Sequence, residues 1–78
     1  MAQAEYPEMA RTAGVTGTVY VRVIVDSDGT PRSATVLKGI GAGCDEAATD
    51  AALRSTFKPG TSYGKPVECS ITIPFTFP

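Results

Sequence analysis

The residue types that carry most enzyme chemistry are scarce in this sequence. Its 78 residues include no histidine and only two cysteines. Without histidine there is no imidazole for proton transfer and no His-ligated metal site. No serine, aspartate or glutamate lies in a recognisable arrangement with a histidine or lysine base. We therefore predict that the protein is not an enzyme, has no catalytic residues, and uses neither a cofactor nor a metal.

Two motifs imitate ligand sites. Gly39, Gly41 and Gly43 lie where phosphate-binding loops occur, but their spacing fits no dinucleotide or P-loop motif. Asp26 and Asp28 resemble the start of a calcium loop, which would need further acidic residues that the sequence lacks. A flexible connector and a tight turn explain the two motifs, so we expect no small-molecule substrate.

The cysteines, Cys44 and Cys69, are far apart in the expected fold. Cys44 begins a helix, and Cys69 lies near the start of the strand that returns from the far end of that helix. At ~1.5 Å per helical residue and ~3.3 Å per strand residue, they miss each other by roughly 10 Å. We predict two free, buried thiols.

The strongest pattern is an alternation near the C-terminus. Apolar side chains at Val67, Cys69, Ile71, Ile73 and Phe75 alternate with mostly polar ones. Successive side chains of a strand point to opposite faces of the sheet, so this run predicts a strand with one buried face and one solvent-exposed face.

Four further elements position this strand. Spacing and end signals predict a short helix at 7–13, a strand at 17–25, a second strand at 32–38 and a helix at 45–56. An Asp-Gly turn joins the first two strands. The inward residues are predicted to be Val19, Val21, Val23 and Val25 on the first strand, Ala34 and Val36 on the second, and Cys44, Ala48, Ala51, Ala52 and Ser55 along the helix, with Phe57 at the end of the core.

The order of elements allows two sheets. The last strand can pair in parallel with the second strand or antiparallel with the first. Strands in parallel ladders are usually apolar on both faces, whereas this strand is polar on one. We therefore predict one α+β domain over residues 1–78, with 1–6 extended. Its three-stranded antiparallel sheet has the order 2-1-3, and both helices pack on one face.

This order leaves two sheet edges with unequal protection. The second strand is protected against pairing with another chain by Pro31, Arg32 and Lys38. The last strand has only Glu68 as such protection. An edge with unpaired N–H and C=O groups is a template for an extended peptide. The alternative is an ordinary amphipathic strand, covered by a neighbouring segment or by nothing. The predicted peptide-binding residues are Val67, Glu68, Cys69, Ser70, Ile71, Thr72 and Ile73.

A series of short motifs in order carries a family resemblance over residues 3–77. The motifs are Tyr6-Pro7, Gly17-x-Val19-x-Val21-x-Val23, Asp26-x-Asp28-Gly29, Cys44-Asp45-Glu46-Ala47-Ala48, Phe57-Lys58-Pro59-Gly60, Gly64-Lys65-Pro66-Val67 and Ile73-Pro74-Phe75. The chain resembles the TonB C-terminal domain, the periplasmic end of energy transducers in Gram-negative bacteria. It departs from many members in having Ser55 and Thr56 near a usual tryptophan and Glu5 at a frequent glutamine.

The resemblance implies a function. Such domains are anchored by an inner-membrane helix and a proline-rich linker, both outside this chain. They bind the TonB box, an N-terminal peptide of outer-membrane transporters, by strand addition. An inner-membrane motor complex then drives import of iron chelates or cobalamin. The resemblance also implicates Gln3, Glu5, Tyr6 and Pro7 in contact with the transporter.

Charge and hydropathy limit which other kinds of partner the protein can have. The formal net charge is −1, with no basic patch for nucleic acid or an anionic membrane surface, and no apolar run approaches the ~20 residues of a membrane span. Two alternatives remain open: an interaction or sensor module appended to a periplasmic signalling or peptidase protein, and self-association, including a strand-exchanged homodimer.

Overall fold

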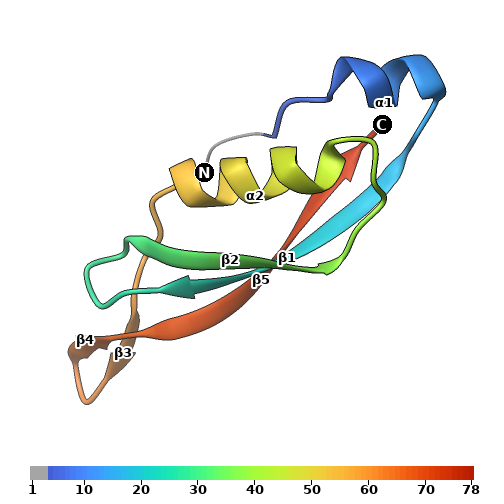
Figure 1. The fold of residues 1–78 in the computed structure, drawn as a ribbon. Coiled ribbons are helices and arrows are strands. Elements are labelled where there is room, and N and C mark those ends of the chain that lie inside the picture. Colours follow the sequence, from blue (N-terminus) through green and yellow to red (C-terminus); the bar gives the residue numbers. More distant parts are fainter. Residues whose placement is uncertain (1–3) are drawn as a thin grey trace.

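A computed structural model describes residues 4–78. The elements in chain order are α1 (Glu8–Ala13), β1 (Gly17–Val25), β2 (Pro31–Lys38), α2 (Cys44–Arg54), β3 (Gly60–Ser62), β4 (Lys65–Val67) and β5 (Cys69–Phe77). Strands β2, β1 and β5 form an antiparallel sheet in that order, and β3 and β4 form a separate hairpin (Figure 1). With β5 as the predicted third strand, the α+β fold and the strand order 2-1-3 are confirmed.

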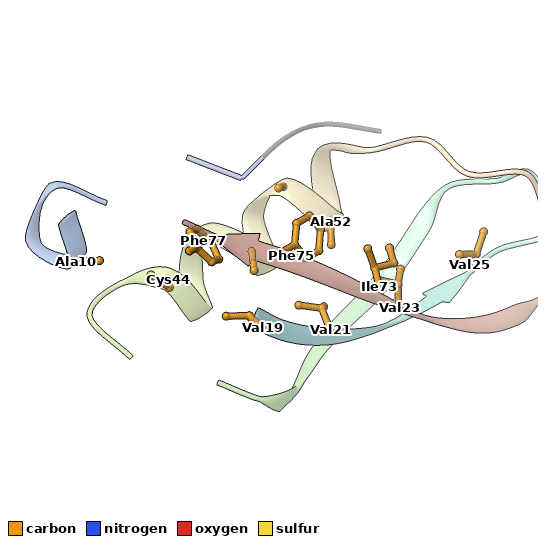
Figure 2. Close-up of a cluster of buried hydrophobic side chains, with 12 residues drawn as sticks. Ala10, Val19, Val21, Val23, Val25, Cys44, Ala52, Ile73, Phe75 and Phe77 are labelled. Atoms are coloured by element: carbon orange, nitrogen blue, oxygen red, sulfur yellow. The ribbon is translucent and has the colours of Figure 1, made fainter. Parts of the chain in front are cut away.

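The core follows from the alternation along β1. Its valines at positions 19, 21, 23 and 25 are 0% exposed. Strand β5 pairs with β1 in an unbroken register from Val25↔Cys69 to Gly17↔Phe77. Figure 2 shows side chains of β5 beside these valines, with Ala52 of α2 near Phe75. The predicted inward pair of β2, Ala34 and Val36, is half-buried against this core.

Helix α2 covers the valine face through a stripe of small side chains. The predicted members of that stripe, Cys44, Ala48, Ala51, Ala52 and Ser55, are all buried. Small side chains let the helix axis lie close to the sheet, which fits the burial of the stripe. The helix lies mainly over β2 and β1 and touches β5 at few positions.

Two features at the ends of α2 define its limits. It starts at Cys44, and the Asp45 carboxylate accepts hydrogen bonds from the backbone N–H groups of Ile40 (2.9 Å) and Gly41 (3.3 Å). The glycine loop is therefore held by the same acidic residue that would repel a phosphate. The helix ends at Arg54, because Ser55 is extended with φ −84° and ψ 157°. The prediction of a helix to residue 56 was thus too long.

Helix α1 and the segment before it lie at the Phe77 end of the sheet. Pro7 precedes the helix with φ −60° and ψ 141°, so the helix starts at Glu8, one residue later than predicted. The Tyr6 hydroxyl donates to the Val15 carbonyl at 2.6 Å, and its ring centroid lies 5.9 Å from that of Phe77. The N-terminal segment is therefore attached to the end of β5.

The β3–β4 hairpin is a feature that the sequence analysis missed. No strand was predicted between the second helix and the C-terminal strand, but Gly60 pairs with Val67 and Ser62 with Lys65. Tyr63 and Gly64 form the turn with positive φ angles of 51° and 77°, as a type I′ hairpin turn requires. The molecule is elongated, with principal extents of 48 × 18 × 16 Å. The hairpin lies at one end and α1 at the other (Figure 1).

The last strand of the sheet is consequently shifted from its predicted position. Strand β5 starts at Cys69, because the chain before it belongs to the hairpin, and it continues through Pro74 to Phe77. Val67, predicted to be buried, is 36% exposed in β4. The alternation of apolar residues continues across a break between two strands, and the sequence pattern alone does not show that break.

Candidate functional site: the open edge of β5

Strand β5 is an edge strand. It pairs with β1 on one side, and no other strand within residues 4–78 pairs with it on the other side. Strand β2 is the opposite edge of the sheet. The prediction that the C-terminal strand lies at an edge is therefore confirmed.

The hydrogen bond at the β1–β2 turn fixes which backbone groups of β5 face outward. The Asp26 N–H donates to the Thr30 carbonyl at 2.9 Å, so the backbone of Asp26 faces β2. Directions alternate along a strand, so Val25 faces β5, where it lies opposite Cys69. Since the register is unbroken, the odd-numbered residues of β5 bond to β1. The residues whose N–H and C=O groups face the open side are Ser70, Thr72, Pro74 and Thr76.

Two prolines agree with this assignment. Pro74 lies opposite Tyr20 in the outward-facing set, so its missing N–H costs no bond to β1. Pro31 lies opposite Val25, whose backbone faces the other way, so β2 also loses no bond to β1. The open edge therefore presents the N–H groups of Ser70 and Thr72 in succession, and then a gap at Pro74.

The side chains of β5 divide by face. Ser70 and Thr72 are exposed on the face away from α2. On the helix side, Ile73 is 7% exposed, whereas Cys69 and Ile71 are only half-buried, since α2 barely reaches them. An added strand would cover Cys69 and Ile71 further, so the edge offers apolar surface together with backbone hydrogen bonds.

The structure places two of the predicted edge residues outside β5. Val67 lies in β4, and Glu68 lies between the two strands. The Glu68 carboxylate forms an ion pair with the Arg32 guanidinium at 2.5 Å, and both side chains are about half exposed. This pair joins Arg32 of β2 to the residue just before β5, across the end of β1. Cys69, Ser70, Ile71, Thr72 and Ile73 do lie together on β5.

The predicted N-terminal contact residues have different environments. Gln3 lies outside the described residues. Glu5 is exposed, whereas Tyr6 and Pro7 are half-buried. A Cβ added at Gly43 would lie 3.4 Å from the Pro7 ring, so Pro7 fits against the start of α2. Tyr6 and Pro7 therefore both help to attach the segment to the domain, next to the Phe77 end of β5.

The two thiols are free, as predicted, but only one is fully buried. Cys44 is buried and Cys69 half-buried. Burial raises the pKa of the Cys44 thiol above its usual 9.0, and the carboxylates of Asp45 and Glu46 raise it further. Cys44 is thus an inert core residue.

The remaining candidate motifs are structural. The Asp28 carboxylate accepts the Thr30 N–H at 2.9 Å, and this bond lowers the pKa of Asp28 below its usual 3.8. Residues 4–78 contain no group of three or more His, Cys, Asp or Glu that could hold a metal. No helix in this range is long and apolar enough to cross a membrane.

Fold and site together define a class: a small α+β domain that presents a vacant sheet edge. Residues 2–78 match the family described as Gram-negative bacterial TonB protein C-terminal, so the chain belongs to this family. The family consists of non-enzymatic protein-interaction domains that interact with outer-membrane transporters. No curated protein and no solved structure matches the chain.

Proposed function

We propose that the protein is the periplasmic domain of an energy transducer and that β5 binds the TonB box of an outer-membrane transporter by strand addition. The guest peptide pairs with the outward N–H and C=O groups of Ser70 and Thr72. The inner-membrane motor complex acts through an anchor and linker outside this chain, and the transmitted force supports import of solutes such as iron chelates or cobalamin.

The observation that carries this proposal is the vacant edge of β5. Its backbone groups alternate between β1 and the open side, and its apolar side chains Cys69 and Ile71 are incompletely covered. The family interacts with outer-membrane transporters, and a vacant edge is the surface that an extended peptide can pair with.

The energetics favour weak, reversible binding. Each ladder hydrogen bond contributes about 0.5–1.5 kcal/mol net, while ordering a peptide costs about 1–2 kcal/mol per residue. A pull directed along a peptide that is paired with β5 is shared by all of its ladder hydrogen bonds at once. Such a contact withstands a pull along the strand and releases when the pull ends.

Hydrogen exchange on ¹⁵N-labelled protein tests the proposal. In the free protein, the amides of Ser70 and Thr72 should exchange rapidly, whereas those of Ile71 and Ile73, which face β1, should be protected. A synthetic TonB-box peptide should protect Ser70 and Thr72 and shift resonances along β5. The control is the same peptide with prolines at alternate positions. No shift, or shifts confined to the loop 39–43, would contradict strand addition.

Self-association through the same edge is the competing outcome. Two copies paired along β5 would also protect Ser70 and Thr72, but without peptide and in proportion to protein concentration. A sedimentation series on the free protein separates the two cases, because a peptide-binding monomer shows no concentration dependence.

A further inference from the structure

Tyr63 at the tip of the β3–β4 hairpin is the most exposed large hydrophobic residue of residues 4–78. It is 103% exposed, and its hydroxyl makes no hydrogen bond to any residue of that range. Its φ of 51° is left-handed, a conformation that disfavours residues with a Cβ and that hairpin turns usually fill with Asn, Asp or Gly. Neither packing nor turn geometry explains a tyrosine at this position.

The hairpin is also positively charged. Lys58 and Lys65 flank Tyr63, both are exposed, and neither forms an ion pair within residues 4–78. No acidic residue occurs between Lys58 and Glu68, and Glu68 is paired with Arg32. The rest of the chain has five basic and eight acidic residues, from totals of seven and eight. Residues 58–67, the hairpin together with the segment that leads into it, therefore form a cationic arm on an otherwise acidic domain.

The arm is continuous with the open edge. Strand β4 ends at Val67, and β5 starts at Cys69. At the base of the arm, a Cβ added to Gly60 would lie 3.2 Å from the Cβ of Cys69, so the hairpin packs closely against the start of β5. The β3–β4 hairpin thus projects from the end of the sheet where β5 begins (Figure 1). A transporter whose peptide lies on β5 therefore has its folded part close to this hairpin.

We infer that the β3–β4 hairpin is a second contact arm for the folded transporter whose TonB box occupies β5, an inference that rests on the proposed function. Tyr63 inserts into an apolar recess on the periplasmic surface of the transporter, and Lys58 and Lys65 face carboxylates around that recess. An exposed tyrosine is a suitable anchor because it brings a large contact area with few rotatable bonds.

The small size of the edge explains the need for a second contact. Specific protein interfaces bury about 1,200–2,000 Å², which is more than a short peptide on Ser70 and Thr72 provides. Long-range attraction between the lysines and carboxylates would also speed association and make it depend on salt. The arm thus distinguishes a folded transporter from a free peptide of the same sequence.

The test compares two ligands, a synthetic TonB-box peptide and the detergent-solubilised transporter from which it is taken. Tyr63→Asn suits the left-handed turn better, so the hairpin stays folded. It should weaken transporter binding about tenfold and leave peptide binding unchanged. The matched control is Tyr20→Thr, which removes an exposed tyrosine from the sheet. Lys58→Gln with Lys65→Gln should reduce the salt dependence of transporter binding alone.

Each other outcome overturns a defined step. If Tyr63→Asn binds the transporter as tightly as wild type, the arm makes no contact, even though strand addition stands. If it weakens both ligands equally, the hairpin acts only by shaping β5. If wild type binds neither ligand, the proposed function fails. If wild type binds vesicles with anionic lipid and Tyr63→Asn does not, the arm contacts a membrane and the inference is wrong.

Discussion

A proline at Thr72 should separate peptide binding from folding. The N–H of Thr72 faces the open side of the sheet, so Thr72→Pro removes no hydrogen bond to β1. Pro74 already occupies a position of the same kind two residues further along. We therefore expect the free energy of unfolding to change by about 1 kcal/mol or less.

The effect on binding is worked out from the same geometry. Ser70 and Thr72 supply the two adjacent outward donors before Pro74. Removing one loses about 0.5–1.5 kcal/mol of net hydrogen bonding and leaves a guest carbonyl without a partner, at about 1–3 kcal/mol if it is buried. A loss of about 2 kcal/mol corresponds to a roughly 30-fold higher Kd.

The assay is isothermal titration with the TonB-box peptide, alongside urea denaturation of each variant. Thr72→Val is the matched control, because it changes the side chain and keeps the N–H. Ile71→Pro is the opposite control, because its N–H bonds to β1, and it should unfold the domain. If Thr72→Pro binds as wild type does, or unfolds as Ile71→Pro does, the assignment of backbone directions along β5 is wrong.

Three further results are expected from the core and the turn. Phe75→Ala should destabilise the domain by about 3–5 kcal/mol in denaturant, much of the stability of a domain this size; a loss below about 1 kcal/mol would contradict its place in the core. A thiol reagent should modify Cys69 in the native state and Cys44 only as fast as the domain unfolds; equal rates would contradict the burial of Cys44. The lowered pKa of Asp28 stabilises the native state above pH 3.8, and this contribution is lost as the pH falls through the lower folded pKa. Asp28→Ala should therefore show a weaker pH dependence of unfolding between pH 5 and 2, and an unchanged dependence would show that the turn bond contributes nothing.

The elements that the sequence predicted are those with a long regular pattern. Valine occupies every second position of β1 from Val19 to Val25, and this repeat defines both the strand and its buried face. The polar face of β5 argued against a parallel sheet and so led to the correct strand order. The small side chains of α2 identified the helix face that contacts the sheet.

The features that the sequence did not predict depend on short-range geometry. Each strand of the β3–β4 hairpin has three residues, too few to show a period, and Tyr63 is an unusual residue for its turn. The only sequence feature that could have indicated this hairpin was Tyr63-Gly64, which lies between two polar segments. The assignment of outward donors required the bond from Asp26 to Thr30, which no sequence pattern specifies.

Pro74 also limits what the edge can accept. A vacant strand as long as β5 is a hazard, because a second extended chain of equal length would propagate into fibrils. The interruption at Pro74 breaks the row of donors after Ser70 and Thr72, leaving Thr76 isolated beyond it. A short guest fits within the uninterrupted part, whereas a long one meets a missing bond. The ring of Pro74 therefore allows β5 to bind a short peptide and disfavours pairing with a long chain that would lead to aggregation.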